Sequence, residues 1–588
     1  MKGAGTIRNL RRTGSDMYLS DNWKIVPRLS ATLGFRWSLP GVTDERDSLE
    51  LLPVTQSGGP VATLLSNATL NFAGSSAGRP WYRRDWHDFA PNIGLAWDVF
   101  GNGKTAVRAA YSIAYVDDQA LLAPQGITEL NAGLIGTAAA SGLSGRVSAG
   151  LPGVVAPLYH VPLTVADNYA VNSFNTVGMI DPSLRTPYVQ QYSIGIEHSW
   201  KQNVFDIRYV GNHAVRGYRA FDFNQVQIKE NGFLDDFLRA QGNGNLALAR
   251  NGTFNPAYNA ALPGSQVLTV FPQLSRGGQL NRNAIRNLIQ TGQVGALAAT
   301  YQEDGLNGSV NFFRNPNALG ADYLTNYSNS TYNSLQAVVR RRSKAGLDYS
   351  ANYTFSKVLS DAAGDTQSRI EHFLDINNAS LERARASFDL RHAIKGTAFY
   401  DLPLGTGRLR SGWTIGSIFS WQSGAPFSIL SGRGTLNRAD GSRSYYNTAV
   451  TALNGGQLAG IVRFEMTGNG PVIIARPAIN AADGTGVNAD GQAAFAGQVF
   501  FNPSAGTVGT LQRRMFSGPW AFNADLSLSK KVDLTEHQSA TLRFDGSNLF
   551  NHPTFLTGDQ NINSTTFGTV SSTLTTPRVL QLSLHYNF

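Results

Sequence analysis

The last eleven residues of the chain, RVLQLSLHYNF (578–588), alternate between apolar and polar side chains. In an extended strand the apolar side chains share one face and the polar side chains share the other. The apolar set is Leu580, Leu582, Leu584, Tyr586 and Phe588. This alternation predicts a strand that fits either the edge of a soluble sandwich or a tilted passage through a bilayer.

Alternating segments recur upstream in pairs that are separated by a few residues. Such a pair predicts a β-hairpin, and the Gly-Asn-Gly at 101–103 is typical of a hairpin turn. The predicted hairpins are 16–38, 91–116, 188–200 with 203–211, 332–342 with 347–357, 391–403 with 412–424, and 521–531 with 540–550. Together with the C-terminal strand they make thirteen strands. Residues 1–15 are expected to form a non-strand N-terminal segment.

The connections between these strands alternate between short and long. The long ones are rich in Asn, Gly and Ser and cover about 39–90, 117–187, 212–329, 358–390, 425–518 and 551–577. Compact soluble domains seldom contain so many long loops. Outer-membrane barrels carry short turns on the periplasmic side and long loops on the extracellular side. The pattern therefore predicts an antiparallel transmembrane β-barrel whose last residue, Phe588, lies at the periplasmic rim.

Composition agrees with an all-β chain in a membrane. Only 15% of the 588 residues are charged, while 61 are Gly, 31 are Phe and 21 are Tyr. No run of about 18 apolar residues occurs, so helical membrane spans are excluded. Cysteine is absent, which excludes disulfides and thiolate metal sites. The net charge of +9 is dispersed and lacks a basic helix or a basic-aromatic motif, so nucleic acid is not an expected partner.

Several aromatic residues fall near the ends of the predicted strands, where amphipathic rings form girdles at the membrane interfaces. They are Trp97, Trp200, Tyr209, Tyr353, Tyr400, Trp413 and Trp421. Aromatic residues are also common in any strand, which is the simpler explanation. The polar strand faces carry Asn, Ser, Asp, Arg and Glu, so they are expected to line water or another protein segment.

Nine stretches, in order along the chain, are similar to the barrel of TonB-dependent outer-membrane receptors. The similarity is greatest to the large Oar-like group, whose full chains begin with a carboxypeptidase-regulatory-like domain. The stretches are 18–37, 89–111, 186–199, 209–214, 332–357, 388–407, 412–429, 542–555 and 567–588. They include YNSLQAVVRRRSKAGLDYSANYTFSK and LRFDGSNLFNHPTF, and they leave only the long loops unmatched.

The resemblance implies a barrel of roughly 22 strands around an N-terminal plug. The thirteen predicted strands correspond to the last part of such a barrel, so the chain is expected to be a partial receptor domain without plug or signal peptide. The start of the chain is basic but has no apolar core, as a signal peptide would have. The implied setting is the Gram-negative outer membrane, with its lipid as one partner. The implied function is import of an unidentified small ligand, a glycan, siderophore or peptide-like molecule, and a TonB-type energy-coupling complex would act only through the missing plug.

Two sets of residues are singled out for function. The resemblance implies that Leu582, Leu584, Tyr586 and Phe588 form the signal that barrel-assembly machinery recognises, although these residues also suit a lipid-facing strand. The stretch WYRRDWHD (81–88) combines aromatic rings with guanidinium groups, so Trp81, Tyr82, Arg83, Arg84, Trp86 and His87 are candidate ligand contacts or a membrane-rim anchor.

No pattern for catalysis, a cofactor or a metal is found, because the chain lacks HExxH, a nucleophile elbow, a Walker loop and a Rossmann fingerprint in the right context. An enzyme is therefore not expected. The alternative functions are a passive outer-membrane porin or a surface adhesin. A third alternative is a soluble secreted β-rich enzyme or propeller. A propeller needs internal repeats at a fixed period, and none is found.

Overall fold

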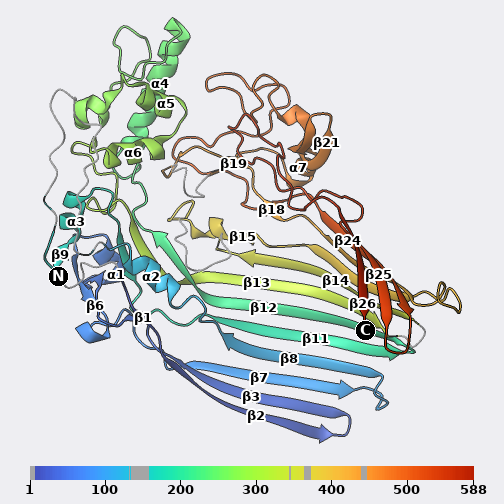
Figure 1. Ribbon diagram of the computed structural model, residues 1–588. Coiled ribbons are helices and arrows are strands. Elements are labelled where there is room, and N and C mark those ends of the chain that lie inside the picture. Colours follow the sequence, from blue (N-terminus) through green and yellow to red (C-terminus); the bar gives the residue numbers. More distant parts are fainter. Residues whose placement is uncertain are drawn as a thin grey trace.

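The computed structural model describes residues 7–131, 133, 156, 158–342, 346–362, 373–438 and 447–588. Its centre is a 15-stranded sheet in which thirteen long strands follow one another in chain order, each antiparallel to the next. The sheet is strongly curved, and the helices and irregular loops gather at one end of its strands (Figure 1). The prediction of an all-β antiparallel architecture is confirmed.

The thirteen strands include every predicted hairpin and the C-terminal strand. They are β2 (Gly14–Val26), β3 (Leu29–Pro40), β7 (Asp88–Asp98), β8 (Thr105–Tyr115), β11 (Tyr188–Trp200), β12 (Asn203–Asp222), β13 (Ala321–Arg341), β14 (Leu347–Ser360), β16 (His392–Asp401), β17 (Trp413–Gln422), β24 (Ala521–Asp533), β25 (Ser539–Ser547) and β26 (Val579–Asn587). Two short strands complete the sheet: β10 (Val177–Ile180) pairs with β13, and β15 (Ala384–Arg385) pairs with β14. The period-2 alternation was sufficient to find the strands because one face of each is apolar.

Two predicted boundaries are wrong. Residues 1–15 were expected outside the strands, but β1 (Leu10–Arg11) pairs with β4 (Asp44–Glu45), and β2 begins at Gly14. The loop expected at 212–329 is shorter, since β12 and β13 continue to pair as far as Asp222 and Asp322. The last five residues of β12 are all buried. Where both faces of a strand are covered, the alternation that marks a strand in the sequence disappears.

The first two long loops and the loop after β14 contain short elements. They are β5 (Glu50–Pro53), α1 (Gly59–Leu64), β6 (Thr69–Ala73), η1 (Ser75–Ala77), α2 (Leu122–Thr128), β9 (Leu163–Thr164), α3 (Val165–Val171) and η5 (Ala379–Glu382). Thr164 caps α3 by a capping box, in which its hydroxyl accepts from Asp167 N–H and the Asp167 carboxylate accepts from Thr164 N–H.

The loop between β12 and β13 folds into a helical unit with its own core. It contains α4 (Phe233–Asn251), η3 (Phe271–Gln273), η4 (Ser275–Gln279), α5 (Asn283–Gln290) and α6 (Val294–Glu303). Phe233, Phe271, Tyr301 and Phe312 pack against one another at its centre and are almost fully buried. The buried Asp236 carboxylate accepts hydrogen bonds from the backbone N–H groups of residues 269–271 and so ties α4 to η3.

A second loop unit is built from two loops far apart in the sequence, 425–518 and 551–577. Its elements are β18 (Pro426–Phe427), β19 (Leu430–Ser431), β20 (Asn447–Thr448), α7 (Gly455–Ile461), β21 (Val462–Thr467), β22 (Gly470–Ile474), η6 (Arg476–Ala478) and β23 (Phe516–Ser517). Phe500 and Phe567 meet edge to face in its core at 5.9 Å between ring centroids. The long loops are therefore folded structures with apolar interiors.

The large sheet has two free edges. Within the described part of the chain, β2 pairs with β3 alone and β26 with β25 alone, and β2 does not meet β26. All thirteen residues of β2 are exposed. None of the described helices is long and apolar enough to cross a membrane.

Candidate functional site: the polar face of the sheet and the extracellular loops

The register of the strands separates the sheet into an apolar face and a polar face. Residues directly opposite each other on neighbouring strands lie on the same face. One such row crosses five strands as Ile196, Ile207, Ala337, Tyr353 and Ile394. The next row, on the other face, contains Gly195, Arg208, Gln336, Thr354 and Ala393. The apolar face suits lipid and the polar face suits water or a polar protein segment.

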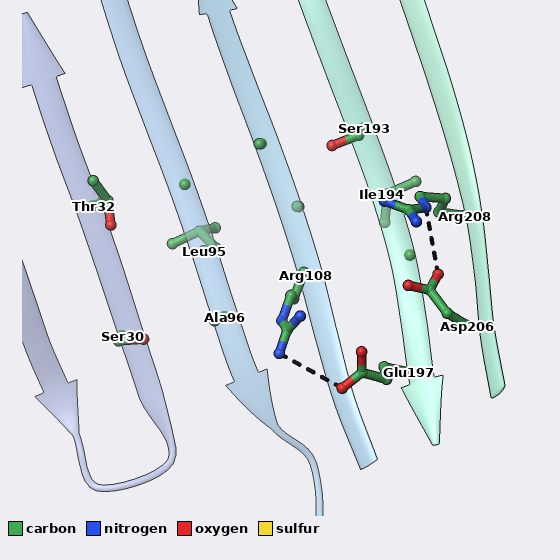
Figure 2. A pocket seen from close by; sticks show the side chains of 14 residues that line it. Ser30, Thr32, Leu95, Ala96, Arg108, Ser193, Ile194, Glu197, Asp206 and Arg208 are labelled. Carbon is green, nitrogen blue, oxygen red and sulfur yellow. Dashed lines mark ion pairs between the residues drawn. The ribbon is translucent and has the colours of Figure 1, made fainter. Parts of the chain in front are cut away.

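A charged groove lies on the polar face of β3, β7, β8, β11 and β12, with a volume of about 350 Å³. Figure 2 shows its charged side chains reaching out from neighbouring strands. Arg108 Nη2 lies 3.7 Å from Glu197 Oε1, and Arg208 Nε lies 3.6 Å from Asp206 Oδ1. Arg340 Nη2 approaches the other Glu197 oxygen at 3.6 Å. Three cations thus face two carboxylates.

The groove is open because several small residues line it. Gly94, Ala96, Ala110 and Gly195 leave space between the long side chains of the neighbouring rows. The ion pairs are longer than 3.5 Å, a distance that leaves room for bridging water, and the Arg108 side chain is 63% exposed. Exposed pairs of this kind add little to stability. They make this part of the sheet polar, with charges of opposite sign side by side.

The structure separates the predicted interface aromatics into two groups. Trp97, Trp200, Tyr400 and Trp413 lie within one residue of the strand ends at the short turns, and Trp421 lies near the opposite end of β17. For these five residues the girdle stays a prediction. Tyr209 and Tyr353 do not lie near strand ends, since each is the seventh residue of a strand of 14 or more residues.

The two central tyrosines have local hydrogen-bond partners instead. The Tyr209 hydroxyl donates to Asn333 Oδ1 at 2.5 Å, and the Tyr353 hydroxyl lies 2.8 Å from His392 Nδ1. Both tyrosine hydroxyls on the apolar face are thereby satisfied without water. The girdle interpretation is wrong for Tyr209 because β12 continues to Asp222, beyond its predicted end at residue 211, and it is wrong for Tyr353 because this residue lies half-way along β14.

The stretch WYRRDWHD is only partly available to a ligand. Trp81 and Tyr82 are 3% and 8% exposed and pack into the core of the first loop, where the Tyr82 hydroxyl accepts a hydrogen bond from Thr43 N–H. The prediction that these two residues contact a ligand is therefore wrong, since the loop folds over them.

The rest of this stretch lies on the surface. Arg83, Arg84, Trp86 and His87 are exposed. The guanidinium of Arg84 stacks over Trp86 at 4.3 Å from the ring centroid, and Trp37 Nε1 donates to the Trp86 carbonyl. These contacts hold Trp86 at the extracellular end of β3. The contact of these four residues with a ligand stays a prediction.

A buried ion triad, which the sequence did not indicate, joins three extracellular segments. Glu382 Oε2 accepts from Arg219 Nη2 at 3.0 Å and from Arg513 Nη1 at 3.3 Å, and its other oxygen accepts from Leu374 N–H at 2.8 Å. The Arg219 and Glu382 side chains are each 1% exposed. Arg219 also lies over the Phe373 ring at 4.3 Å.

Burial also acts on a neighbouring carboxyl. It raises the pKa of Asp361, although a hydrogen bond from Asn329 N–H and the charge of Arg219 oppose the shift. Arg219 donates to the backbone carbonyl of the same residue at 2.5 Å. The end of β12, the loop after β14 and the loop before β24 are thereby joined through one low-dielectric centre. No single stretch of sequence marks it, because its members are more than 100 residues apart.

The terminal strand presents its predicted signal residues outward. Leu582, Leu584, Tyr586 and Phe588 are between 51% and 92% exposed, and the rings of Tyr586 and Phe588 stack at 5.9 Å. Leu582 and Leu584 lie opposite Phe544 and Leu542 on the apolar face. The strand is both a free edge and a continuation of the lipid-facing surface, so its role in assembly stays a prediction.

Comparison with known families decides the class of this sheet. The family model described as an outer membrane beta barrel domain matches residues 3–581, which is almost the whole chain. The chain belongs to this family. The outer membrane β-barrel family places the protein in the outer membrane of Gram-negative bacteria, with the apolar sheet face against lipid. None of the curated protein sequences matches the chain.

Among solved structures, outer-membrane receptors and transporters are similar to this barrel domain at low identity. The ferripyoverdine receptor of Pseudomonas aeruginosa is 11% identical, with a TM-score of 0.36 over 99% of this chain and 39% of the receptor. The transporter YddB of Escherichia coli is 10% identical, with a TM-score of 0.39 over 98% of this chain and 54% of that chain. The siderophore receptor PiuA of Acinetobacter baumannii is 9% identical, with a TM-score of 0.37 over 98% of this chain and 43% of that receptor. The chain spans about half or less of these proteins.

Proposed function

We propose that the chain forms the wall and the extracellular loops of a TonB-dependent receptor of the Oar-like group, which imports a small ligand. The observation that carries the proposal is a curved thirteen-strand sheet with a charged polar face, joined to large folded loops at one end of its strands (Figure 1). A wall of this kind supplies a hydrated inner surface. The loops supply the outward-facing surface on which a ligand is first held.

The direction of the edge strands supports a partial barrel. The short turns are assigned to the periplasm, so β2 and β26 both run from the extracellular to the periplasmic side. If these two edges met, they would pair in parallel, whereas every other pair along the thirteen-strand path is antiparallel. An odd number of further strands closes the sheet with antiparallel pairs throughout. A receptor barrel of about 22 strands requires about nine more.

In this proposal the chain contributes binding surface and path, and the coupling device is a separate plug segment. The charged groove on β7, β8 and β11 faces the space that a plug or water occupies. Because the charges of the groove are paired with one another, a polar segment can pass or dock there and no charge of the groove needs the segment as its partner. Energy coupling reaches this chain through the plug.

The open sheet predicts the behaviour of the chain on a gel. Unboiled protein from outer-membrane fractions is expected to migrate with boiled protein, because a sheet with two free edges does not form the closed barrel that resists detergent. Co-production with a segment that supplies the missing strands is expected to restore a faster unboiled band. A faster band from the chain alone would show that it closes by itself, and would favour a passive porin over a partial receptor.

Deletion of Phe588 is expected to lower the amount of chain in the outer-membrane fraction several-fold. The reason is that Phe588 follows directly after β26, is 92% exposed and offers a terminal apolar contact to assembly machinery. Asn587→Ala, on the polar face of the same strand, is the control and should leave insertion unchanged. Equal insertion of the deletion variant and the intact chain would remove the assembly role from Phe588.

A further inference from the structure

A cleft of about 450 Å³ lies between the two extracellular units. One wall comes from α4 and the end of α5, with Leu238, Gln241 and Gln290. The other comes from residues 487–505, with Gln492, Phe501 and Ser504 among its lining side chains. This volume falls within the range of about 300–1,000 Å³ that is usual for small-ligand sites. In Figure 1 the two units stand above the strands as the green and the orange-brown parts.

The floor of the cleft is held by one ion pair. Arg433 donates to both oxygens of Asp490 at 2.6 and 2.7 Å, and its Nη1 also donates to the Thr291 carbonyl at 3.0 Å. The Arg433 and Asp490 side chains are 14% and 28% exposed. A bidentate pair of this kind is geometrically rigid. The bond from Arg433 to the Thr291 carbonyl joins the loop before β24 to the segment after α5, and the ion pair fixes the position of Arg433 for this bond.

The described residues that line the cleft carry no net charge. Of its described lining residues, Arg433 and Asp490 alone are charged, and they neutralise each other. An anionic metal chelate would need an unpaired cation in such a site. The other lining residues are amides, hydroxyls and small or aliphatic side chains, including Leu238, Val487 and Pro503.

Three side chains in the cleft have hydrogen-bonding capacity to spare. Within the described part of the chain, the amides of Gln290 and Gln492 and the hydroxyl of Ser504 make no side-chain hydrogen bond. Other amides of the lining are already used: Gln498 accepts from Asn488 N–H and donates to the Phe500 carbonyl. Two of these three groups are amides, Gln290 and Gln492, and they come one from each wall of the neutral site.

We propose that this cleft binds a short, uncharged peptide segment in an extended conformation. A side-chain amide offers one acceptor and two donors, which match the N–H and C=O of a peptide group. Gln290 and Gln492 pair with the peptide backbone from opposite walls, and Leu238 and Phe501 receive its apolar side chains. Leu238 and Phe501 are 45% and 39% exposed, so peptide binding buries apolar surface at both.

The lining favours a peptide over an oligosaccharide. Sugar rings stack on aromatic faces, whereas Phe501 is the one aromatic side chain among the described lining residues. Alanines at 489, 494 and 505, together with Leu238 and Val487, form an aliphatic surface that fits aliphatic side chains better than hydroxylated rings. This inference rests on the proposed receptor function for its biological use, because it names the class of ligand that the loops hold.

The test uses the full chain, purified in detergent and immobilised, with a mixture of short synthetic peptides as the probe. Their ends are acetylated and amidated, and one half of the mixture contains Asp, Glu, Lys or Arg while the other half contains none of them. Retained peptides are identified by mass spectrometry, and neutral maltose oligomers are applied in parallel. The expected result is retention of short uncharged peptides with aliphatic residues. Gln290→Ala with Gln492→Ala is expected to lower retention at least about tenfold through the loss of two hydrogen-bonding groups. Asn287→Ala, an exposed amide on the same helix outside the cleft, should retain peptides as the intact chain does.

Each result decides the proposal. Retention of maltose oligomers instead of peptides overturns it, as does retention that is equal in the double variant and in Asn287→Ala. No retention by a chain whose α4 and α5 helices are intact by circular dichroism also overturns it. Peptide binding by the chain, with no uptake by cells that also supply the missing strands and the plug, would leave this inference standing and remove the proposed receptor function. Uptake by such cells without peptide binding would do the reverse.

Discussion

Glu382→Ala is expected to destabilise the extracellular loop assembly by about 3–5 kcal/mol. Among the described residues, Glu382 is the one carboxylate that pairs with both buried guanidinium groups, at 3.0 Å from Arg219 and 3.3 Å from Arg513. Its removal takes a shared negative charge from two cations in a low-dielectric centre, and it also deprives Leu374 N–H of its acceptor. The loss therefore exceeds that of an ordinary ion pair. Native-state proteolysis in increasing urea measures the free energy of opening of these loops.

The control is an exposed pair on the loop unit that contains Arg513. Arg463 and Glu465 lie 3.4 Å apart with side chains 59% and 47% exposed, so Glu465→Ala should change the opening free energy by less than about 1 kcal/mol. A triple variant, Arg219→Met with Glu382→Leu and Arg513→Met, separates charge burial from packing. It is expected to recover most of the stability, since a buried ion network replaced as a whole by apolar side chains is often neutral. Equal effects of Glu382→Ala and Glu465→Ala would contradict the role of the triad.

The strands were predictable from the sequence because a membrane-spanning hairpin must repeat its apolar positions with period 2. The alternation predicts a strand at RVLQLSLHYNF and thirteen long strands in all, and both predictions match the structure. The same signal failed at 218–222, where β12 is buried on both faces. Because the alternation is lost there, the strand seemed to end near Tyr209, whereas Tyr209 is the seventh residue of a 20-residue strand.

The loops were not predictable in the same way, because their cores are made by segments distant in the sequence. In the sequence Trp81 looks like an exposed aromatic residue, but the first loop folds over it and buries it. Phe500 contacts Phe567 although a whole hairpin lies between them in the sequence. The cleft between the loop units has the same origin: Gln290 and Gln492 come together only after both units fold. Local pattern gives the position of a strand, whereas these sites depend on which loops meet.

The assignment of the two sheet faces predicts opposite outcomes for neighbouring residues of β11. Ile194, the seventh residue of this 13-residue strand, lies in an apolar row between Ala109 and Tyr209 and is 55% exposed. Ile194→Arg is expected to cost about 2–4 kcal/mol, because it places a guanidinium on the lipid face near the bilayer midplane. Ser193→Arg is the matched control, since Ser193 lines the charged groove on the polar face, where Glu197 and Asp206 are near (Figure 2).

Urea unfolding of the chain from lipid vesicles measures both variants, and the outer-membrane fraction of producing cells gives an independent readout. Ser193→Arg is expected to stay within about 1 kcal/mol of the intact chain, because a groove with water can hydrate the new charge. A larger loss in Ser193→Arg than in Ile194→Arg would reverse the two faces, and lipid would then lie against the row of Arg108 and Arg208. Equal and small losses would mean that neither face of β11 lies against lipid, which would contradict the placement of this strand in the membrane wall.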